Sequence, residues 1–194
     1  MTSFKDRLKA ARLPERTVPI CLRGDLVAEW EELDRQLTEA LRAPSTSLEG
    51  DGSGPIAERM EDLRQQMQAE TTPFRLRAMP KPRWRAFVGE HPPRKDDEGG
   101  IDDRDRVVGV NTETFYTALI RESVVDPALD EEDWAYLLGG EVQDEQGKTL
   151  AVEARLTSRQ FDDLADAAWG LNRRDIDVPF SPAASRMTRG SGTE

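Results

Sequence analysis

The sequence is short of the residues from which most active sites are built. It has one cysteine, Cys21, and one histidine, His91, in 194 residues. One cysteine excludes an intramolecular disulfide, and one cysteine with one histidine cannot form a zinc ligand cluster. A Ser-His-Asp or Cys-His site would have to use His91, which lies in the stiff segment EHPPRK. We therefore expect a protein with no catalytic activity, no cofactor and no metal.

Long apolar runs and excess basic charge are also missing. No apolar run approaches the roughly 20 residues that span a bilayer, and the N-terminal segment MTSFKDRLKAAR lacks the apolar stretch of a secretory signal. Lys and Arg number 27 against 38 Asp and Glu, which gives a net charge of −11. Such a chain disfavours phosphate backbones and anionic membranes. These features predict a protein of the cytoplasm that does not bind membranes.

Two polar segments resemble ligand sites in composition only. The glycine-rich segment GDGSG (50–54) lacks the Lys-Ser/Thr pair of a phosphate-binding loop. The acidic residues between Asp96 and Asp105 do not follow EF-hand spacing. We interpret residues 44–54 as a linker and the acidic run as solvated charge.

Two amphipathic helices are the clearest pattern in the chain. Apolar residues recur at spacings of three and four over residues 25–43 and again over 55–70, which is typical of helices with one apolar face. The stripes are Leu26, Trp30, Leu33, Leu37 and Leu41, then Ile56, Met60, Leu63 and Met67. Joined by the linker, they predict an antiparallel helical hairpin.

Strands are predicted on both sides of this hairpin. Residues 16–22 and 72–79 alternate apolar with polar side chains. Pro19 lacks a backbone donor, so the first strand should lie at a sheet edge. The two strands could pair antiparallel and close the base of the hairpin, supported by a helix over residues 80–91.

The second half of the chain predicts further helices. We expect a helix over 112–123, a short one after Asp130 and a last one capped by Thr157, with a small hairpin or a loose insert at 139–155. The predicted fold is mainly α: a helical hairpin closed by a small two-stranded β element, then a small C-terminal helical bundle. Its divisions are 1–95, an acidic loop at 96–110, a helical subdomain at 111–172 and a disordered tail at 173–194.

Charge is divided unevenly along the chain. Residues 73–95 carry seven Lys and Arg against one acid, whereas residues 96–170 carry twenty acids against six bases. Either the two segments compensate each other, or the basic one binds a partner through interleaved aromatic and arginine residues, which are typical interface anchors. The candidate partner-binding residues are Phe74, Arg75, Leu76, Arg77, Arg83, Trp84, Phe87 and Trp134.

Five segments in this order resemble a known family. They are VPICLRGDLVAEWEELDRQL, TTPFRLRAMPKPRWRAFVGEHPPR, VGVNTETFYTALIRESVVDP, DEEDWAYLL and LTSRQFDDLADAAWGLNRR. Together they resemble the tail assembly chaperones of long-tailed phages of actinobacteria, or of related prophages, over residues 16 to about 174. The residues that carry the resemblance are Leu22, Arg23, Gly24, Leu26, Phe74, Leu76, Ala78, Trp84, His91, Pro92, Pro93, Arg94, Asn111, Phe115, Pro127, Trp134, Leu156, Thr157, Leu164, Trp169 and Asn172. The segment 139–155 looks longer than in the family.

The resemblance implies a role in the host cell cytoplasm. Such a protein coats the tape-measure protein and keeps it soluble, then gives way as tail-tube subunits polymerise. Contact with the tail-tube protein and self-association are further possibilities. The alternatives are a structural virion protein of the tail or head-tail junction, which mass spectrometry of purified virions would detect, and a nucleic-acid-binding regulator using residues 73–95.

The charge distribution yields the first testable prediction. On a heparin column at physiological salt the chain should flow through, because its net charge opposes binding to a polyanion. Retention at that salt would instead favour the regulator that uses residues 73–95.

Overall fold

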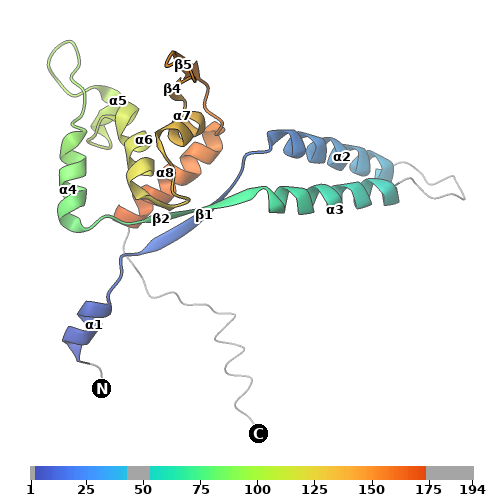
Figure 1. Ribbon diagram of the computed structural model, residues 1–194, viewed down its shortest axis with the longest axis horizontal. Helices are drawn as coiled ribbons and strands as arrows, with labels where there is room; N and C mark the ends of the chain where they lie inside the picture. Colours follow the sequence, from blue (N-terminus) through green and yellow to red (C-terminus); the bar gives the residue numbers. More distant parts are fainter. Residues whose placement is uncertain (1–2, 43–52, 174–194) are drawn as a thin grey trace, which may run out of the picture.

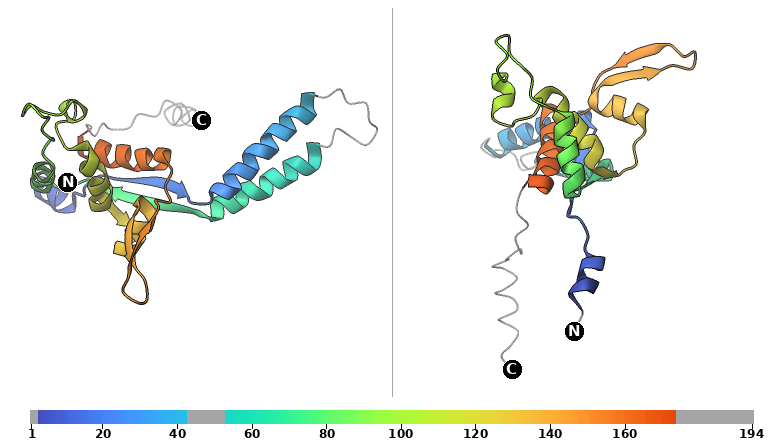
Figure 2. Two further views of the ribbon diagram at one scale, coloured as in Figure 1. Left: turned by 90° about the horizontal axis from the view of Figure 1, so that it is seen from above. Right: turned by 90° about the vertical axis from the view of Figure 1, so that its left-hand side faces the viewer.

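The computed structural model describes residues 3–42 and 53–173. The elements are α1 (Phe4–Ala10), β1 (Glu15–Cys21), α2 (Gly24–Arg42), α3 (Ser53–Ala69), β2 (Thr71–Arg77), α4 (Lys81–Glu90), α5 (Asp103–Arg106), α6 (Thr112–Ser123), β3 (Val124–Asp126), α7 (Glu131–Leu138), β4 (Gly140–Gln143), β5 (Thr149–Val152) and α8 (Ser158–Arg173). Helices α2 and α3 form an arm that projects from a body containing the other helices, except α1 (Figures 1 and 2).

A long antiparallel ribbon connects the arm to the body. Strands β1 and β2 pair along their whole length, from Glu15 opposite Arg77 to Cys21 opposite Thr71. Strand β3 joins the other side of β2, where Val124 lies opposite Leu76. The sheet order is therefore β1-β2-β3, and the prediction that the Pro19 strand lies at an edge is confirmed.

The main hydrophobic core lies in the body. Every second residue of β2 points inward, so that Phe74 and Leu76 are buried against helices α6 and α8. Three apolar residues of α6, Phe115, Leu119 and Ile120, are also buried. Because this single cluster includes Phe87 of α4 as well, it joins the segments 1–95 and 111–172 that the sequence assigned to separate parts.

The predicted fold class is wrong. The described residues form eight helices and two antiparallel sheets, of three and two strands, rather than a hairpin with a two-stranded base followed by a separate helical bundle. Strand β3 has only three residues, too few to show alternation in the sequence. It completes the three-stranded sheet, and α6 and α8 pack on this sheet instead of forming a bundle of their own.

Several local predictions agree with the structure. The predicted cap Thr157 accepts a hydrogen bond from the backbone N–H of Gln160 at the start of α8. The structure adds a capping box of Ser3 and Asp6 at α1. Residues 139–155 form the β4–β5 hairpin, whose turn places Gly147 at a φ of 77°, a conformation that glycine adopts without strain. The linker prediction falls on residues outside the described part except for residues 53 and 54, which begin α3. The tail predicted as disordered lies outside it too, apart from Arg173 at the end of α8.

A cluster of aromatic rings ties α4 to the rest of the body. The Trp84 ring centroid lies 6.1 Å from those of Phe87 and Phe115, and 5.9 Å from that of Trp169. These residues belong to α4, α6 and α8, so Trp84 bridges three helices.

This arrangement predicts that Trp84→Ala destabilises the body. The free energy of unfolding should fall by about 3 kcal/mol, because the contacts of a large aromatic side chain are lost and a cavity remains. Urea denaturation followed by circular dichroism measures the change. The control is Arg85→Ala, at an exposed position of the same helix. An unchanged denaturation midpoint for Trp84→Ala would contradict the bridging role.

Candidate partner-binding surface

The apolar members of the predicted partner-binding set lie inside the protein. Phe74 and Phe87 are each 2% exposed, Leu76 is fully buried, and Trp134 is 8% exposed. Burial of this kind leaves almost no side-chain surface for a partner while the body stays folded. The structure therefore places these four side chains in the core, and it leaves Trp84 half-buried beside them.

Two arginines of this set lie on the outer face of β2. Arg77 donates a hydrogen bond from Nε to Glu15 at 2.6 Å, and Arg75 lies 3.4 Å from the same carboxylate. The hydrogen bond from Arg77 lowers the pKa of Glu15 below its usual value. Cross-strand pairing thus neutralises part of the basic charge within the ribbon itself.

The third arginine, Arg83, links two helices at the surface. Its guanidinium donates to Glu122 of α6 and to Glu90 of its own helix, both at 2.7 Å, and these bonds raise the pKa of Arg83. The pair with Glu122 joins the basic segment to the acidic second half, as the compensation hypothesis expects. That these three arginines contact a partner stays a prediction.

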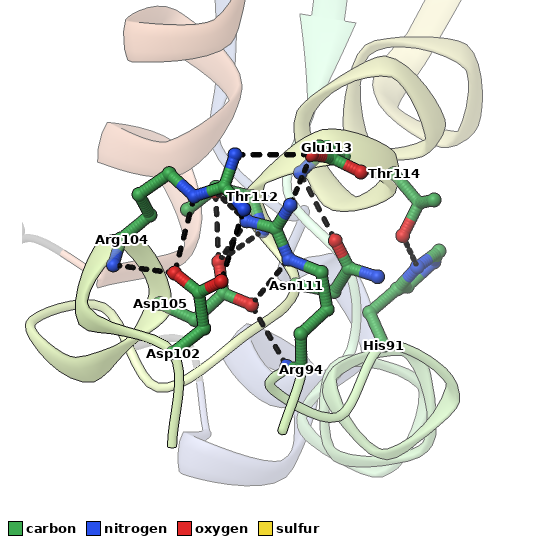
Figure 3. A network of polar contacts seen from close by, with 9 residues as sticks. All are labelled: His91, Arg94, Asp102, Arg104, Asp105, Asn111, Thr112, Glu113 and Thr114. Atoms are coloured by element: carbon green, nitrogen blue, oxygen red, sulfur yellow. Dashed lines mark hydrogen bonds and ion pairs between the residues drawn. The ribbon is translucent and has the colours of Figure 1, made fainter. Parts of the chain in front are cut away.

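A buried ion pair fixes the loop after α4, and the sequence reading missed it. Asp105, interpreted as solvated charge, is fully buried, and it takes part in the network of polar contacts in Figure 3. Its carboxylate accepts hydrogen bonds from the backbone N–H, Nε and Nη2 of Arg94 at 2.7 to 2.9 Å, and from the backbone and hydroxyl of Thr112. Arg94 also pairs with Glu113. These bonds hold the pKa of Asp105 well below its ordinary value, with the Arg94 side chain as the main cause.

The sole histidine has contacts of a structural kind. His91 ends α4, its ring lies 4.9 Å from that of Phe87, and Nδ1 lies 3.1 Å from the Thr114 hydroxyl (Figure 3). Cys21 ends β1, where its carbonyl accepts a hydrogen bond from Gln160. The two residues thus belong to opposite ends of the body and do not form a pair.

The arm carries a long apolar stripe outside the main core cluster. In α2 and α3 only Leu26 and Leu63 are buried, and neither belongs to the main core cluster. The other stripe residues from Trp30 to Leu37 and from Ile56 to Met67 are half-buried, and Leu41 is 65% exposed. Two helices cover only part of each other's apolar faces, so the stripe keeps an open side along an arm about 28 Å long.

The rest of the arm is acidic. Helices α2 and α3 carry nine acidic and four basic side chains. Many pair within the arm: Arg59 of α3 bonds to Glu29 of α2 at 2.6 Å, and Arg35 bonds to Glu32 of its own helix. Charged flanks on both sides of an apolar stripe are the arrangement that accepts an amphipathic helix.

Comparisons of the chain with known protein families, with characterised proteins and with solved structures find no match. Across the described ranges, no group of three or more His, Cys, Asp or Glu side chains is placed to hold a metal ion. In the same part of the chain, no helix has both the length and the apolarity to cross a membrane.

The Asp105 network predicts a dependence of stability on pH. Because the folded protein lowers the pKa of Asp105, its contribution is complete above the unfolded value of about 4 and is lost as the pH falls through the folded value. Urea midpoints of the wild type should therefore drop below about pH 4. The Asp105→Asn variant should already be less stable at pH 7 and show a shallower drop.

The matched control for this measurement is Asp103→Asn, because Asp103 is exposed in the same short helix. The urea midpoint of this control should change with pH as that of the wild type does. Equal midpoints for Asp105→Asn and the wild type at pH 7 would show that the network does not stabilise the fold.

Proposed function

We propose that the chain is a tail assembly chaperone that binds the phage tape-measure protein and keeps it soluble in the host cytoplasm. The observation that carries this proposal is the half-open apolar stripe of the arm, held away from the core by the β1–β2 ribbon. The ordered resemblance over residues 16 to about 174 supports the choice of client.

The stripe suits an amphipathic helix that lies along the arm. Its half-buried residues repeat every three or four positions on both helices, so a third helix could pack against the apolar faces of both. The acidic flanks favour client segments with basic residues beside their apolar face. The holding surface is therefore the arm, and Arg75, Arg77 and Arg83 on the body remain candidates for additional contacts.

The expected strength of this contact fits a temporary partner. Covering the exposed remainder of a half-buried apolar side chain contributes about 1 kcal/mol, so six such residues contribute about 6 kcal/mol. Loss of translational and rotational freedom on association offsets much of this gain. The result is reversible binding, and many copies along a long helical client could still cover it until tube subunits replace them.

Co-expression with the tape-measure protein of the same phage tests the proposal. Wild-type chain should keep the tape-measure protein in the soluble fraction and co-purify with it. Trp30→Lys combined with Met60→Lys places two charges in the stripe and should weaken co-purification about tenfold, the effect of losing about 1.4 kcal/mol.

The matched control is Gln36→Lys combined with Gln65→Lys, which adds the same charges to exposed positions of the same helices. It should behave like the wild type. If the stripe variant is folded and holds the client as well as the control does, the arm is not the holding surface.

A further inference from the structure

Helix α1 stands apart from the rest of the described chain, residues 11–42 and 53–173. All seven of its residues are exposed, including Phe4 at 68% and Leu8 at 58%, and the views from two sides place it away from every other helix (Figures 1 and 2). Phe4 and Leu8 are four positions apart, so they share one face. Isolated helices shorter than about 12 residues are marginal in water. Helix α1 therefore lacks the covering surface that its own apolar face requires.

A groove of suitable size lies where the arm meets the body. Two hollows, of about 380 and 270 Å³, share the lining residues Leu22 and Arg155 and so lie side by side, and we call them together the junction groove. Its apolar walls include Val27 of α2, Tyr136 of α7 and Leu129, which precedes α7. Leu22 is 46% exposed and Tyr136 is 39% exposed, so apolar surface is accessible there.

The charges of the helix and the groove are complementary. Helix α1 carries Lys5, Arg7 and Lys9 against one acid, and Arg12 follows it. Glu31 lines one hollow of the groove and Asp133 the other, against the single base Arg155, which lines both. This excess of basic side chains suits the helix to approach an acidic surface.

The structure holds the helix away from the groove of its own chain. Helix α1 is attached at the Glu15 end of β1, whereas the groove lies beside Cys21 at the other end. From Pro14, the connection back to Ala10 spans at most about 14 Å, whereas the strand carries the chain about 23 Å from Pro14 to Cys21. If α1 folded back along the strand, Phe4 could come level with Cys21, so docking within one chain is the competing arrangement, and a monomeric wild type would reveal it.

We propose that α1 docks in the junction groove of a second copy of this chain, with Phe4 and Leu8 on its apolar walls and its basic side chains toward Glu31 and Asp133. The contact joins two different surfaces, so reciprocal docking closes a dimer and non-reciprocal docking builds a longer chain of copies. This interface is separate from the stripe of the arm and does not depend on the proposed function.

Sedimentation equilibrium of the full-length protein tests this interface. An interface of this small size should have a dissociation constant on the order of 10–100 µM, so the measurement runs up to about 300 µM. The weight-average mass of the wild type should rise from 21.8 kDa toward at least twice that value. Phe4→Asp combined with Leu8→Asp should stay monomeric, and it cannot unfold the body because both residues are exposed.

A matched control separates docking from a simple change of charge. Ile101→Asp combined with Val107→Asp adds the same two charges at exposed apolar positions on either side of α5. This control should associate like the wild type. A groove variant, Leu22→Asp combined with Tyr136→Asp, should be monomeric alone while its circular dichroism spectrum is unchanged.

Mixing the helix variant with the groove variant gives the decisive outcome. The first keeps an intact groove and the second an intact helix, so the mixture should form a heterodimer although each variant alone does not associate. A labelled peptide of residues 3–13 should also bind the helix variant and not the groove variant.

A monomeric wild type at the highest concentration, or a helix variant that associates like the control, would overturn the proposal. Peptide binding that is lost with the arm variant Trp30→Lys/Met60→Lys and kept with the groove variant would overturn it too.

Discussion

The antiparallel pairing of β1 with β2 fixes both parts of the molecule at once. At one end Cys21 and Thr71 lie opposite each other, and the chain enters α2 and leaves α3 within a few residues of them. At the other end β2 continues into the body, where its inward residues are buried and its outer arginines pair with Glu15. The same ribbon thus holds two long helices side by side and keeps them away from the core that stabilises the body.

This separation explains why the arm and the body differ in packing. In the body, the sheet, α4, α6, α7 and α8 surround a continuous core, and the Arg94–Asp105 pair secures the loop above it. In the arm, α2 and α3 pack only against one another among the described elements, so their apolar faces are half covered. The proposed function requires that a client bind to the arm and leave it without disturbing the core, and this separation meets that requirement.

Local patterns in the sequence predicted most elements, while their arrangement depended on contacts that the patterns do not encode. The three-to-four spacing gave the arm helices, and alternation gave β1 and β2. Strand β3 was missed because three residues are too few to show a period. Without β3, the packing of α6 and α8 on one sheet was missed as well. The alternation in FRLR showed which side of β2 is apolar, but the pattern could not tell whether a core or a partner covers that side.

The candidate surface was predictable only in part for the same reason. A stripe such as Leu26 to Leu41 looks alike in a closed bundle and in an isolated arm, so the sequence indicated the helices and not their open side. Asp105 was interpreted as solvated because it lies in an acidic run, and only its bonds to Arg94 and Thr112 reveal its burial. Hydrogen–deuterium exchange of the chain, alone and bound to the tape-measure protein, tests the central claim most directly. The account predicts that binding slows exchange in α2 and α3 and leaves the body unchanged. Unchanged exchange in the arm, with slower exchange in the body around residues 73–95, would contradict it.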